Sequence, residues 1–413
     1  MNFRILLIFI FLLIIVKVVV NANIANNIAF SFDQVEIKGF LTTGATRGDS
    51  NNPLNYEIDK KVNYLYDTKL GLNFSSIITN HWTIAAQLLA KKWTGENEED
   101  FKVKADWIFA KYRPYNSLYF KVGKQKLPLW LISEYLDVGL LYPWIRPPLE
   151  VYTLGPLSNF FGGSINYTYD FGTYSVISEV FIGQTSFNLK DRNLEYSKGK
   201  TESIFGSNIT FFHPQVKIRA SVVRAPRSYQ DNYFQTNTNT YDNGDTTRPV
   251  RNSYSQTFIT TKTLNDFTFW TLGTQLNYYD SFLYSEYAHL DEHAKDFFDG
   301  KYDSFYFTLG HRIKKVTPVL TYAFYKANLS NLIYIVDSNP PQTVISSTAR
   351  ISKQHSLIAG LIIHTTDNSD LKFEYQRSEV LKTNGTYEHG LFSETPGPQR
   401  PVSIFSIAFD YVF

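Results

Sequence analysis

The sequence has 413 residues, and its 40 basic and 38 acidic side chains leave a formal net charge of +2. A balance this close to neutral gives no indication of binding to nucleic acid. The absence of cysteine excludes disulfides, a thiolate nucleophile and Cys-based zinc sites. The 29 Tyr, 33 Phe and 6 Trp are far more aromatic surface than one soluble core of this size ordinarily uses, whereas the aromatic girdles of a membrane barrel would accommodate them.

The N-terminus has the organisation of a secretory signal peptide over residues 1–22. Arg4 supplies a positive n-region, residues 5–16 form an unbroken apolar run, and the residues up to Ala22 fit the small-residue rule for cleavage. A single membrane anchor is the alternative, but the apolar run is short for a span of roughly 20 residues. We therefore expect export and a mature chain of residues 23–413, folded as one domain.

After residue 22 the sequence contains no apolar run of transmembrane-helix length, so the mature chain cannot cross a membrane as helices. A soluble exported protein and a closed β-barrel remain. Alternation of apolar and polar residues favours the barrel, as the strand expected at residues 101–112 illustrates. Its outward face would carry Phe101, Val103, Ala105, Trp107 and Phe109, and its inward face Lys102, Lys104 and Asp106.

About sixteen such segments are expected, and 14 or 18 strands are also compatible with the pattern. They cover residues 35–45, 62–74, 82–91, 101–112, 118–125, 160–169, 174–184, 203–212, 215–224, 267–279, 282–290, 304–312, 316–325, 355–364, 370–377 and 401–413. Short turns alternate with long connections, and residues 225–265 are expected to be a solvated outer loop. An even number of antiparallel strands joined in this way is typical of bacterial outer-membrane barrels.

The stretch at residues 118–152 departs from the alternation. It begins as the fifth strand and then breaks at Pro128 into about 25 residues that are aromatic and apolar yet carry several charges. A long ordered loop in a β protein is usually functional, so we expect residues 128–152 to fold into the barrel and narrow it. The alternative is a surface loop of a soluble β-sandwich.

The last expected strand, at residues 401–413, is amphipathic and ends on an aromatic residue. Phe405, Ile407 and Phe413 share one face, and Ser406 lies on the other. This resembles the C-terminal signal of bacterial outer-membrane barrels, in which the closing strand ends in Phe. The resemblance implies recognition of this strand by the barrel assembly machinery.

The order of signal peptide, strands, long loop after the fifth strand and terminal Phe resembles the sixteen-stranded general porins of Gram-negative outer membranes. The block VGKQKLP followed by SEYLDVGLLYPWIRPP is similar to porin-like proteins of Proteobacteria whose substrates are mostly unassigned. The resemblance implies passive diffusion of small hydrophilic solutes or ions, an outer-membrane location in contact with lipid and lipopolysaccharide, and a homotrimer. The sequence has no run of clustered arginines on one strand of the kind seen in strongly anion-selective porins, so no solute is specified.

Selectivity of such a pore should depend on charges at its constriction. The expected constriction residues are Lys102, Lys104, Lys121, Lys217 and Arg219 on the wall, and Glu134, Asp137, Arg146 and Glu150 on the loop. Loop acids opposed to wall bases would set a transverse field across the lumen. In the alternative, the same charges pair and hold the loop against the wall. The sequence leaves both readings open.

No catalytic residue, metal site or cofactor is predicted. The eight histidines show no HExxH or other metal-ligand spacing, and there is no GxSxG elbow. We therefore predict that the chain is not an enzyme. A barrel enzyme of protease or lipase type, which needs no such motif, and a soluble exported β-rich binding protein are kept as alternatives.

Overall fold

The computed structural model describes residues 35–51, 58–93, 101–154, 157–191, 194–241, 249–295, 298–330, 332–335, 344–347, 350–383, 391–392 and 400–413. The predicted signal peptide at residues 1–22 lies outside these ranges, and so does the start of the predicted mature chain. No helix within the described ranges is long and apolar enough to span a membrane.

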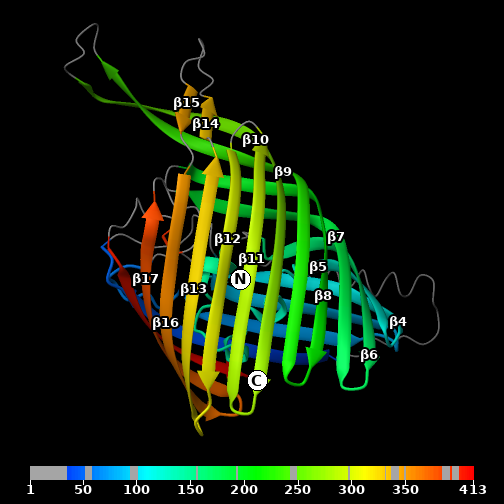
Figure 1. The fold of residues 1–413 in the computed structure, drawn as a ribbon. Coiled ribbons are helices and arrows are strands. Elements are labelled where there is room, and N and C mark those ends of the chain that lie inside the picture. Colours follow the sequence, from blue (N-terminus) through cyan, green and yellow to red (C-terminus); the bar gives the residue numbers. More distant parts are fainter. Residues whose placement is uncertain are drawn as a thin grey trace.

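The described chain forms a closed antiparallel barrel of sixteen strands (Figure 1), which confirms the predicted fold class. The first and last barrel strands pair to close it, with Thr42 opposite Asp410. The barrel strands are β1 (Val35–Gly48), β2 (Lys69–Ile77), β3 (Trp82–Lys92), β4 (Phe101–Tyr115), β5 (Leu118–Lys126), β6 (Asn159–Phe171), β7 (Tyr174–Asp191), β8 (Leu194–His213), β9 (Val216–Tyr241), β10 (Pro249–Tyr278), β11 (Ser281–Lys295), β12 (Phe298–His311), β13 (Val316–Ser330), β16 (Arg350–Thr366), β17 (Ser369–Thr383) and β18 (Val402–Val412). A separate hairpin consists of β14 (Leu332–Ile335) and β15 (Val344–Ser347).

Several predicted boundaries are wrong: β7, β8, β12, β13 and β17 extend five or more residues beyond the expected segments, and two other segments differ in secondary structure. The strand expected at residues 62–74 begins only at Lys69, since the residues before it form bends in which Asn63 is bridged to Thr46 of β1 and Asp67 is buried. The outer loop expected at residues 225–265 is largely strand, since β9 and β10 continue as a hairpin that projects beyond the barrel (Figure 1). Its Tyr and Thr residues favour strands, and that preference prevails over the polar composition from which a loop was predicted.

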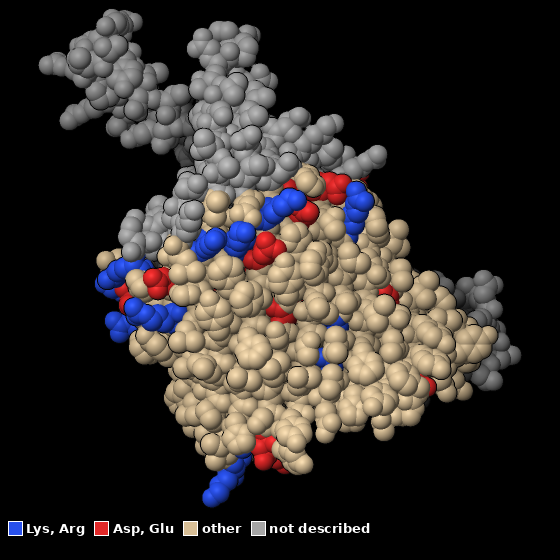
Figure 2. Space-filling model, in the orientation of Figure 1, with Lys and Arg blue, Asp and Glu red and all other residues tan. Residues whose placement is uncertain are grey.

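The two faces of the wall differ as expected for a barrel in a membrane. On β12, Phe305, Phe307 and Leu309 are exposed on the outside, while Tyr306 and Thr308 between them are fully buried inside. Figure 2 shows a broad outer belt that is almost free of charged side chains, with Lys, Arg, Asp and Glu gathered toward the rims. An outer belt of exposed apolar side chains would have no reason to form if the barrel were surrounded by water alone.

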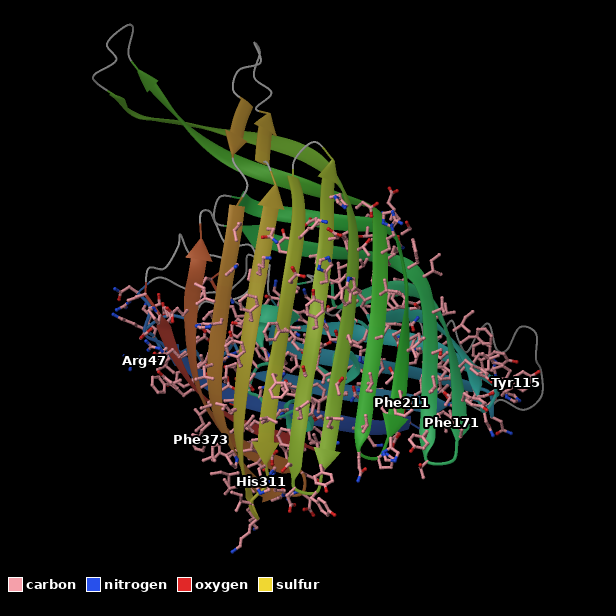
Figure 3. The ribbon with its side chains drawn as sticks, viewed as in Figure 1. Arg47, Tyr115, Phe171, Phe211, His311 and Phe373 are labelled. Carbon is pink, nitrogen blue, oxygen red and sulfur yellow. The ribbon has the colours of Figure 1, made fainter. Side chains whose placement is uncertain are left out.

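Aromatic side chains border the end of the barrel where consecutive strands are joined by short turns, here called the short-turn end. Tyr115, Phe171 and Phe211 lie at this end of β4, β6 and β8 (Figure 3) and are at least partly exposed. The β6–β7 turn is closed by Gly172, whose φ of 67° is one that residues with a Cβ rarely adopt. Rings at this level are typical of the interfacial girdle of a membrane barrel.

A β-bulge in β4 corrects the predicted orientation of two aromatic residues. The register between β3 and β4 shifts after Gln87, which leaves Asp106 as an extra residue and inverts the alternation beyond it. Phe109 therefore lies on the same face as Lys121 and not on the outside, and Trp107 packs against Phe109 with ring centroids 5.4 Å apart. Alternation alone cannot reveal a one-residue insertion of this kind.

Candidate functional site

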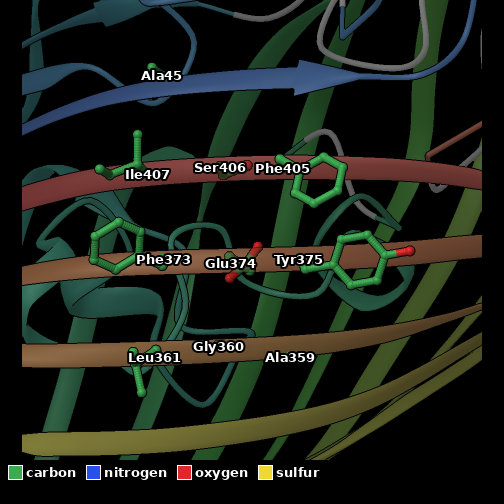
Figure 4. Close-up of a pocket in the computed structure, with 10 residues that line it drawn as sticks. All are labelled: Ala45, Ala359, Gly360, Leu361, Phe373, Glu374, Tyr375, Phe405, Ser406 and Ile407. Atoms are coloured by element: carbon green, nitrogen blue, oxygen red, sulfur yellow. The ribbon is translucent and has the colours of Figure 1, made fainter.

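Residues 127–154 and 157–158, here called the inserted loop, lie inside the barrel, which confirms the predicted loop inserted after the fifth strand. Two short 3-10 turns, η3 (Ser133–Tyr135) and η4 (Gly139–Leu141), and one helical turn, α2 (Leu149–Tyr152), interrupt its path. Figure 4 shows this part of the chain behind the strands of the wall. Several prolines restrict its backbone, which favours one fixed course.

One side of the inserted loop is an apolar core that fills the lumen against β10 to β13. Trp130 meets Phe269 edge to face at 4.8 Å between ring centroids. Trp144 meets Tyr284 and Tyr306 at 5.5 and 5.2 Å in the same geometry. All five residues are at least 93% removed from solvent, so this half of the lumen is closed by close-packed aromatic rings.

Polar groups on the same strands satisfy the backbone and ring donors of the inserted loop. Glu286 of β11 accepts hydrogen bonds from the Leu131 backbone N–H at 2.8 Å and from the Tyr152 hydroxyl at 2.8 Å. The Trp144 indole N–H donates to Thr321 at 2.9 Å. Buried polar groups left without partners would cost free energy, and these contacts keep the loop docked without that cost.

The inserted loop also contacts the opposite wall, where β17, β18 and β1 meet. Lys372 of β17 donates to the carbonyl oxygens of Gly139 and Tyr142 at 2.7 and 2.8 Å, and its Nζ lies 3.0 Å from an Asp410 carboxylate oxygen. A Cβ at Gly139 would lie 2.0 Å from Asp410 Oδ1, so the backbone can approach this closely only because that residue is glycine.

Arg146, one of the predicted constriction residues, is buried at this same junction. It is ion-paired with Asp67, and its Nη2 donates to the Ser406 hydroxyl at 2.6 Å. Glu374 of β17 lies 3.9 Å from it and accepts a hydrogen bond from the Ile145 backbone N–H at 3.1 Å. The polarity here is the reverse of the one predicted, because the loop supplies the base and the wall supplies the acids.

Asp137 carries the loop charge that is most strongly neutralised by the wall. Its two carboxylate oxygens lie 2.7 Å from Lys91 Nζ of β3 and 2.9 Å from Lys126 Nζ of β5. Lys126 is also paired with Asp106, at 2.7 Å. Burial would raise the pKa of the Asp137 carboxyl, but Lys126 and Lys91 outweigh it and hold that pKa well below its ordinary range.

Glu134 faces the wall at β9 and forms a two-bonded pair with Arg219. Arg219 Nη2 lies 2.7 Å from Glu134 Oε1, and Nη1 donates to Oε2 at 2.9 Å and to the Trp130 carbonyl at 2.8 Å. The side chain of Arg219 is 7% exposed and that of Glu134 is 48% exposed, so Glu134 stands at the edge of the loop. Lys217, the other predicted base of β9, donates to the Leu131 carbonyl at 2.8 Å.

Glu150 has no basic partner within the described ranges. It is fully buried, accepts hydrogen bonds from Gln354 at 3.2 Å and from Ser356, and its Oε2 atom has no hydrogen-bond partner among the described residues. Burial raises the pKa of this carboxyl. The side chain packs the loop against β16 and does not face the rest of the constriction.

The predicted bases of β4 and β5 lie on the inner face, but apart from one another. Lys121 is paired with Glu179 of β7 at 3.1 Å. Lys104 lies near the start of β4, at the end of the barrel away from the short turns, and its Nζ is 4.9 Å from the centroid of the Trp93 ring. Lys102 is opposite Lys91 in the β3–β4 register. The nine predicted residues thus form several separate contacts around the lumen and not one cluster.

The wall residues that complete these contacts were not predicted as constriction residues, although Asp106 was placed on the inward face. They are Asp67, Lys91, Asp106, Lys126, Glu179, Glu286, Lys372, Glu374 and Asp410. Most stand at inward positions of alternating strands, so that the pattern marks them as lumen-facing charges. Which of them meet the inserted loop depends on the register and on the path of the loop, which no local pattern contains.

Two further features bear on where a ligand could bind. An apolar groove lies on the outside of the wall between β16, β17 and β18 (Figure 4), and Phe373, Tyr375, Phe405 and Ile407 line it. It faces away from the lumen, and its lining belongs to the outer apolar belt. Among the described residues, no group of three or more His, Asp or Glu is placed to hold a metal ion.

No protein-family model matches the sequence, and no curated protein matches it. Several solved structures match this chain in fold. Outer-membrane expressed OmpT of Vibrio cholerae matches with a TM-score of 0.55 and 10% identity over 94% of this chain and 100% of that one. An anion-selective porin from Comamonas acidovorans matches at 0.54 and 12% over 92% and 99%, and the outer membrane channel DcaP of Acinetobacter baumannii at 0.51 and 9% over 92% and 97%.

These matches define a class: the chain has the fold of the sixteen-stranded outer-membrane porins, as its resemblance to general porins predicted. Identities near 10% extend the likeness to the fold alone. The prediction that the chain is not an enzyme is wrong as an exclusion. Structures of OmpT, an outer membrane protein of Vibrio cholerae, stand beside the porins among the matches, so this similarity of fold does not separate a channel from a barrel with another activity.

Proposed function

We propose that this protein is an outer-membrane channel through which small hydrophilic solutes or ions diffuse passively. The observation that carries the proposal is the asymmetry of the lumen around the inserted loop. Against β10 to β13 the loop is sealed by aromatic rings, and the same apolar cluster reaches Phe160 and Phe181 on β6 and β7. Nearer the short-turn end the inner face of β4 to β9 instead carries charged and amide side chains, and the edge of the loop at Glu134 is half exposed beside them. A polar strip beside a rigid loop is what a narrow aqueous path requires.

The polar strip continues across β6, β7 and β8. Glu179 accepts hydrogen bonds from the side-chain amides of Asn166 at 3.3 Å and Asn208 at 3.0 Å, besides its contact with Lys121. These three side chains are nearly buried and hold one another in place, so that the strip offers charge to the lumen mainly through Lys121, which is 20% exposed, and Glu134, which is 48% exposed. The path is therefore suited to polar solutes, and the immobilised loop sets its width.

The remaining features of the proposal come from the sequence and from the fold. We propose cleavage of residues 1–22 after export, and a location in the outer membrane with lipid and lipopolysaccharide around the apolar belt. The amphipathic β18, which is followed directly by Phe413, is suited to recognition by the barrel assembly machinery. A homotrimer is proposed by analogy, since one matching structure of OmpT is described as a trimer form.

Single-channel recording of refolded residues 23–413 in a planar lipid bilayer tests the channel. We expect discrete conductance steps. The reversal potential under a salt gradient then reports which charges dominate the path. A barrel that is folded by its circular dichroism and by its resistance to protease, but that never conducts, would refute the proposal and turn attention to a closed or catalytic barrel.

A further inference from the structure

The inner face of β4 and β5 carries two lysines that oppose each other directly. Lys111 and Lys121 are partners in the β4–β5 register, which places both side chains on the lumen face. Like charges at directly opposed positions of an antiparallel pair destabilise the sheet. Arg113 follows two residues after Lys111, with its guanidinium carbon 5.5 Å from the centroid of the Tyr119 ring. We call these four residues the basic cluster.

The acids around the basic cluster do not neutralise it. Lys121 has one acidic partner, Glu179, whose carboxylate already accepts from two asparagine amides. On the other side of Lys111 the register places Thr83, which carries no charge. Within the described ranges, neither Lys111 nor Arg113 takes part in an ion pair. Lys111, Arg113 and Lys121 thus have one acidic neighbour among the described residues, Glu179, whose carboxylate also accepts two hydrogen bonds from asparagine side chains.

Elsewhere in the lumen, basic side chains have partners supplied by the protein. The three lysines Lys69, Lys91 and Lys102 also stand in one cross-strand row, but Asp137 of the inserted loop binds Lys91, and Lys69 donates to the Tyr142 hydroxyl at 2.8 Å. Lys372 is likewise matched by Asp410. The row near the loop is therefore compensated by the protein itself, whereas the basic cluster is not.

The basic cluster is also reached by water. Arg113 is exposed, Lys111 is partly exposed and the Lys121 side chain is 20% exposed. The cluster lies near the short-turn end, because the β4–β5 connection follows Tyr115 directly. A solute that passes Glu134 along β4 to β9 would meet it next on the way to this end of the barrel.

From this geometry we infer that Lys111, Arg113 and Lys121 form an anion-binding station in the lumen, which takes small solutes that carry carboxylate or phosphate groups. The inference rests on the proposed channel for its role in transport, but the site itself does not need conduction to exist. A bound carboxylate would supply the missing countercharge, accept hydrogen bonds from the lysines and the guanidinium, and lie beside the Tyr119 ring.

Thermal unfolding of the refolded barrel in detergent tests the site without a bilayer, with citrate as the probe and sodium chloride of equal ionic strength as reference. Citrate should raise the midpoint of the wild type above the reference, because it binds the folded state. Lys111→Gln should raise the reference midpoint by about 1–2 °C through removal of the like-charge pair, and should lose most of the citrate effect. Lys315→Gln removes one charge from an exposed turn at the same end of the barrel and should change neither.

In a planar bilayer the same variants test the role of the cluster in permeation. The wild type should pass chloride in preference to potassium, and Lys111→Gln should lower that permeability ratio about 2- to 5-fold, with Lys315→Gln as the control. Equal citrate responses in wild type and Lys111→Gln would overturn the anion station, whether or not the barrel conducts. Absence of conductance together with a normal citrate response would overturn only the proposed channel.

Discussion

Glu134 of the inserted loop and Arg219 of β9 are joined by two parallel hydrogen bonds of 2.7 and 2.9 Å, between the two ends of a guanidinium and the two oxygens of a carboxylate. The pair is the arrangement expected where these charges hold the loop against the wall, since this acid is not held across an open gap from its base. The loop acids Glu134 and Asp137 are fastened to the wall, and the field across the remaining path comes from the charges that are not paired in this way.

Removal of the Glu134 carboxylate should destabilise the docked loop. Glu134→Gln leaves the buried Arg219 with one weaker acceptor, and because Glu134 itself is half exposed we expect a loss of about 1–2 kcal/mol, less than for a fully buried pair. Urea unfolding in detergent micelles measures it. Glu202→Gln, an exposed position on β8, is the control with the same change of charge. Equal midpoints for the two variants would show that the pair does not hold the loop.

Asp137 predicts how stability depends on pH. Because Lys126 and Lys91 depress the pKa of Asp137 despite its burial, the folded state binds fewer protons at this site than the unfolded one. The stabilisation is therefore present above the ordinary Asp value of 3.8 and is lost as the pH falls below it. The thermal midpoint of the wild type should drop in that range, and Asp137→Asn should start lower and depend less on pH. An unchanged pH profile in Asp137→Asn would contradict this assignment.

Glu150 predicts the opposite behaviour. Its raised pKa means that the folded state favours the neutral carboxyl, so its contribution is present below the ordinary value of 4.5 and is lost as the pH rises through the raised pKa. Glu150→Gln keeps the acceptor for Gln354 and Ser356 and should leave stability at neutral pH unchanged or higher by up to about 1 kcal/mol. Glu150→Ala, which removes the acceptor, should be destabilised. The free energies of unfolding of Glu150→Gln and Glu150→Ala, measured by chemical unfolding at pH 7, test this difference.

Much of the fold could be predicted because a barrel strand is specified locally. The alternation in β18 needs no partner to be recognised, and Phe405 and Ile407 are exposed while Ser406 and Asp410 are buried, as the sequence indicated. The insertion after β5 was equally visible, since Pro128 ends the alternation. The first feature is the two-residue alternation of a strand, and the second is a proline that ends it. Both can be recognised within a window of a few residues.

The candidate site was only partly predictable, since its pairs join residues far apart in the chain. Arg219 and Glu134 are separated by 85 positions, and both were named, but nothing in either segment indicates the other. The bulge at Asp106 reverses the faces of the residues after it, so that Lys111 could not be placed inside by counting. The packing of Trp144 on Tyr284 and Tyr306 could not be predicted, because the aromatic content as a whole was ascribed to membrane girdles and no local pattern pairs the loop with β11 and β12.

The outer belt makes a prediction that separates a membrane barrel from a soluble one. Ile182 of β7 is 64% exposed on the outside of the wall. Ile182→Arg should cost about 2–4 kcal/mol when the barrel folds into lipid vesicles, because a charge would face the hydrocarbon. On a soluble protein the same exposed substitution should change stability by less than about 0.5 kcal/mol. Folding titrations in urea with vesicles measure the difference, and Ile182→Leu is the control.

The closed side of the lumen can be tested through Trp144, which is 1% exposed and packs edge to face on Tyr284 and Tyr306. Trp144→Ala should cost about 3–5 kcal/mol, because it leaves a cavity and removes the donor to the Thr321 hydroxyl. If the aromatic core limits the width of the path, single-channel conductance should rise at the same time. Trp82→Ala is the control, because this ring is exposed on the outer face. It should cost much less stability than Trp144→Ala and should leave the single-channel conductance unchanged. Loss of stability in Trp144→Ala without any rise in conductance would mean that the ring cluster only supports the loop, and that ions are limited along β4 to β9 alone.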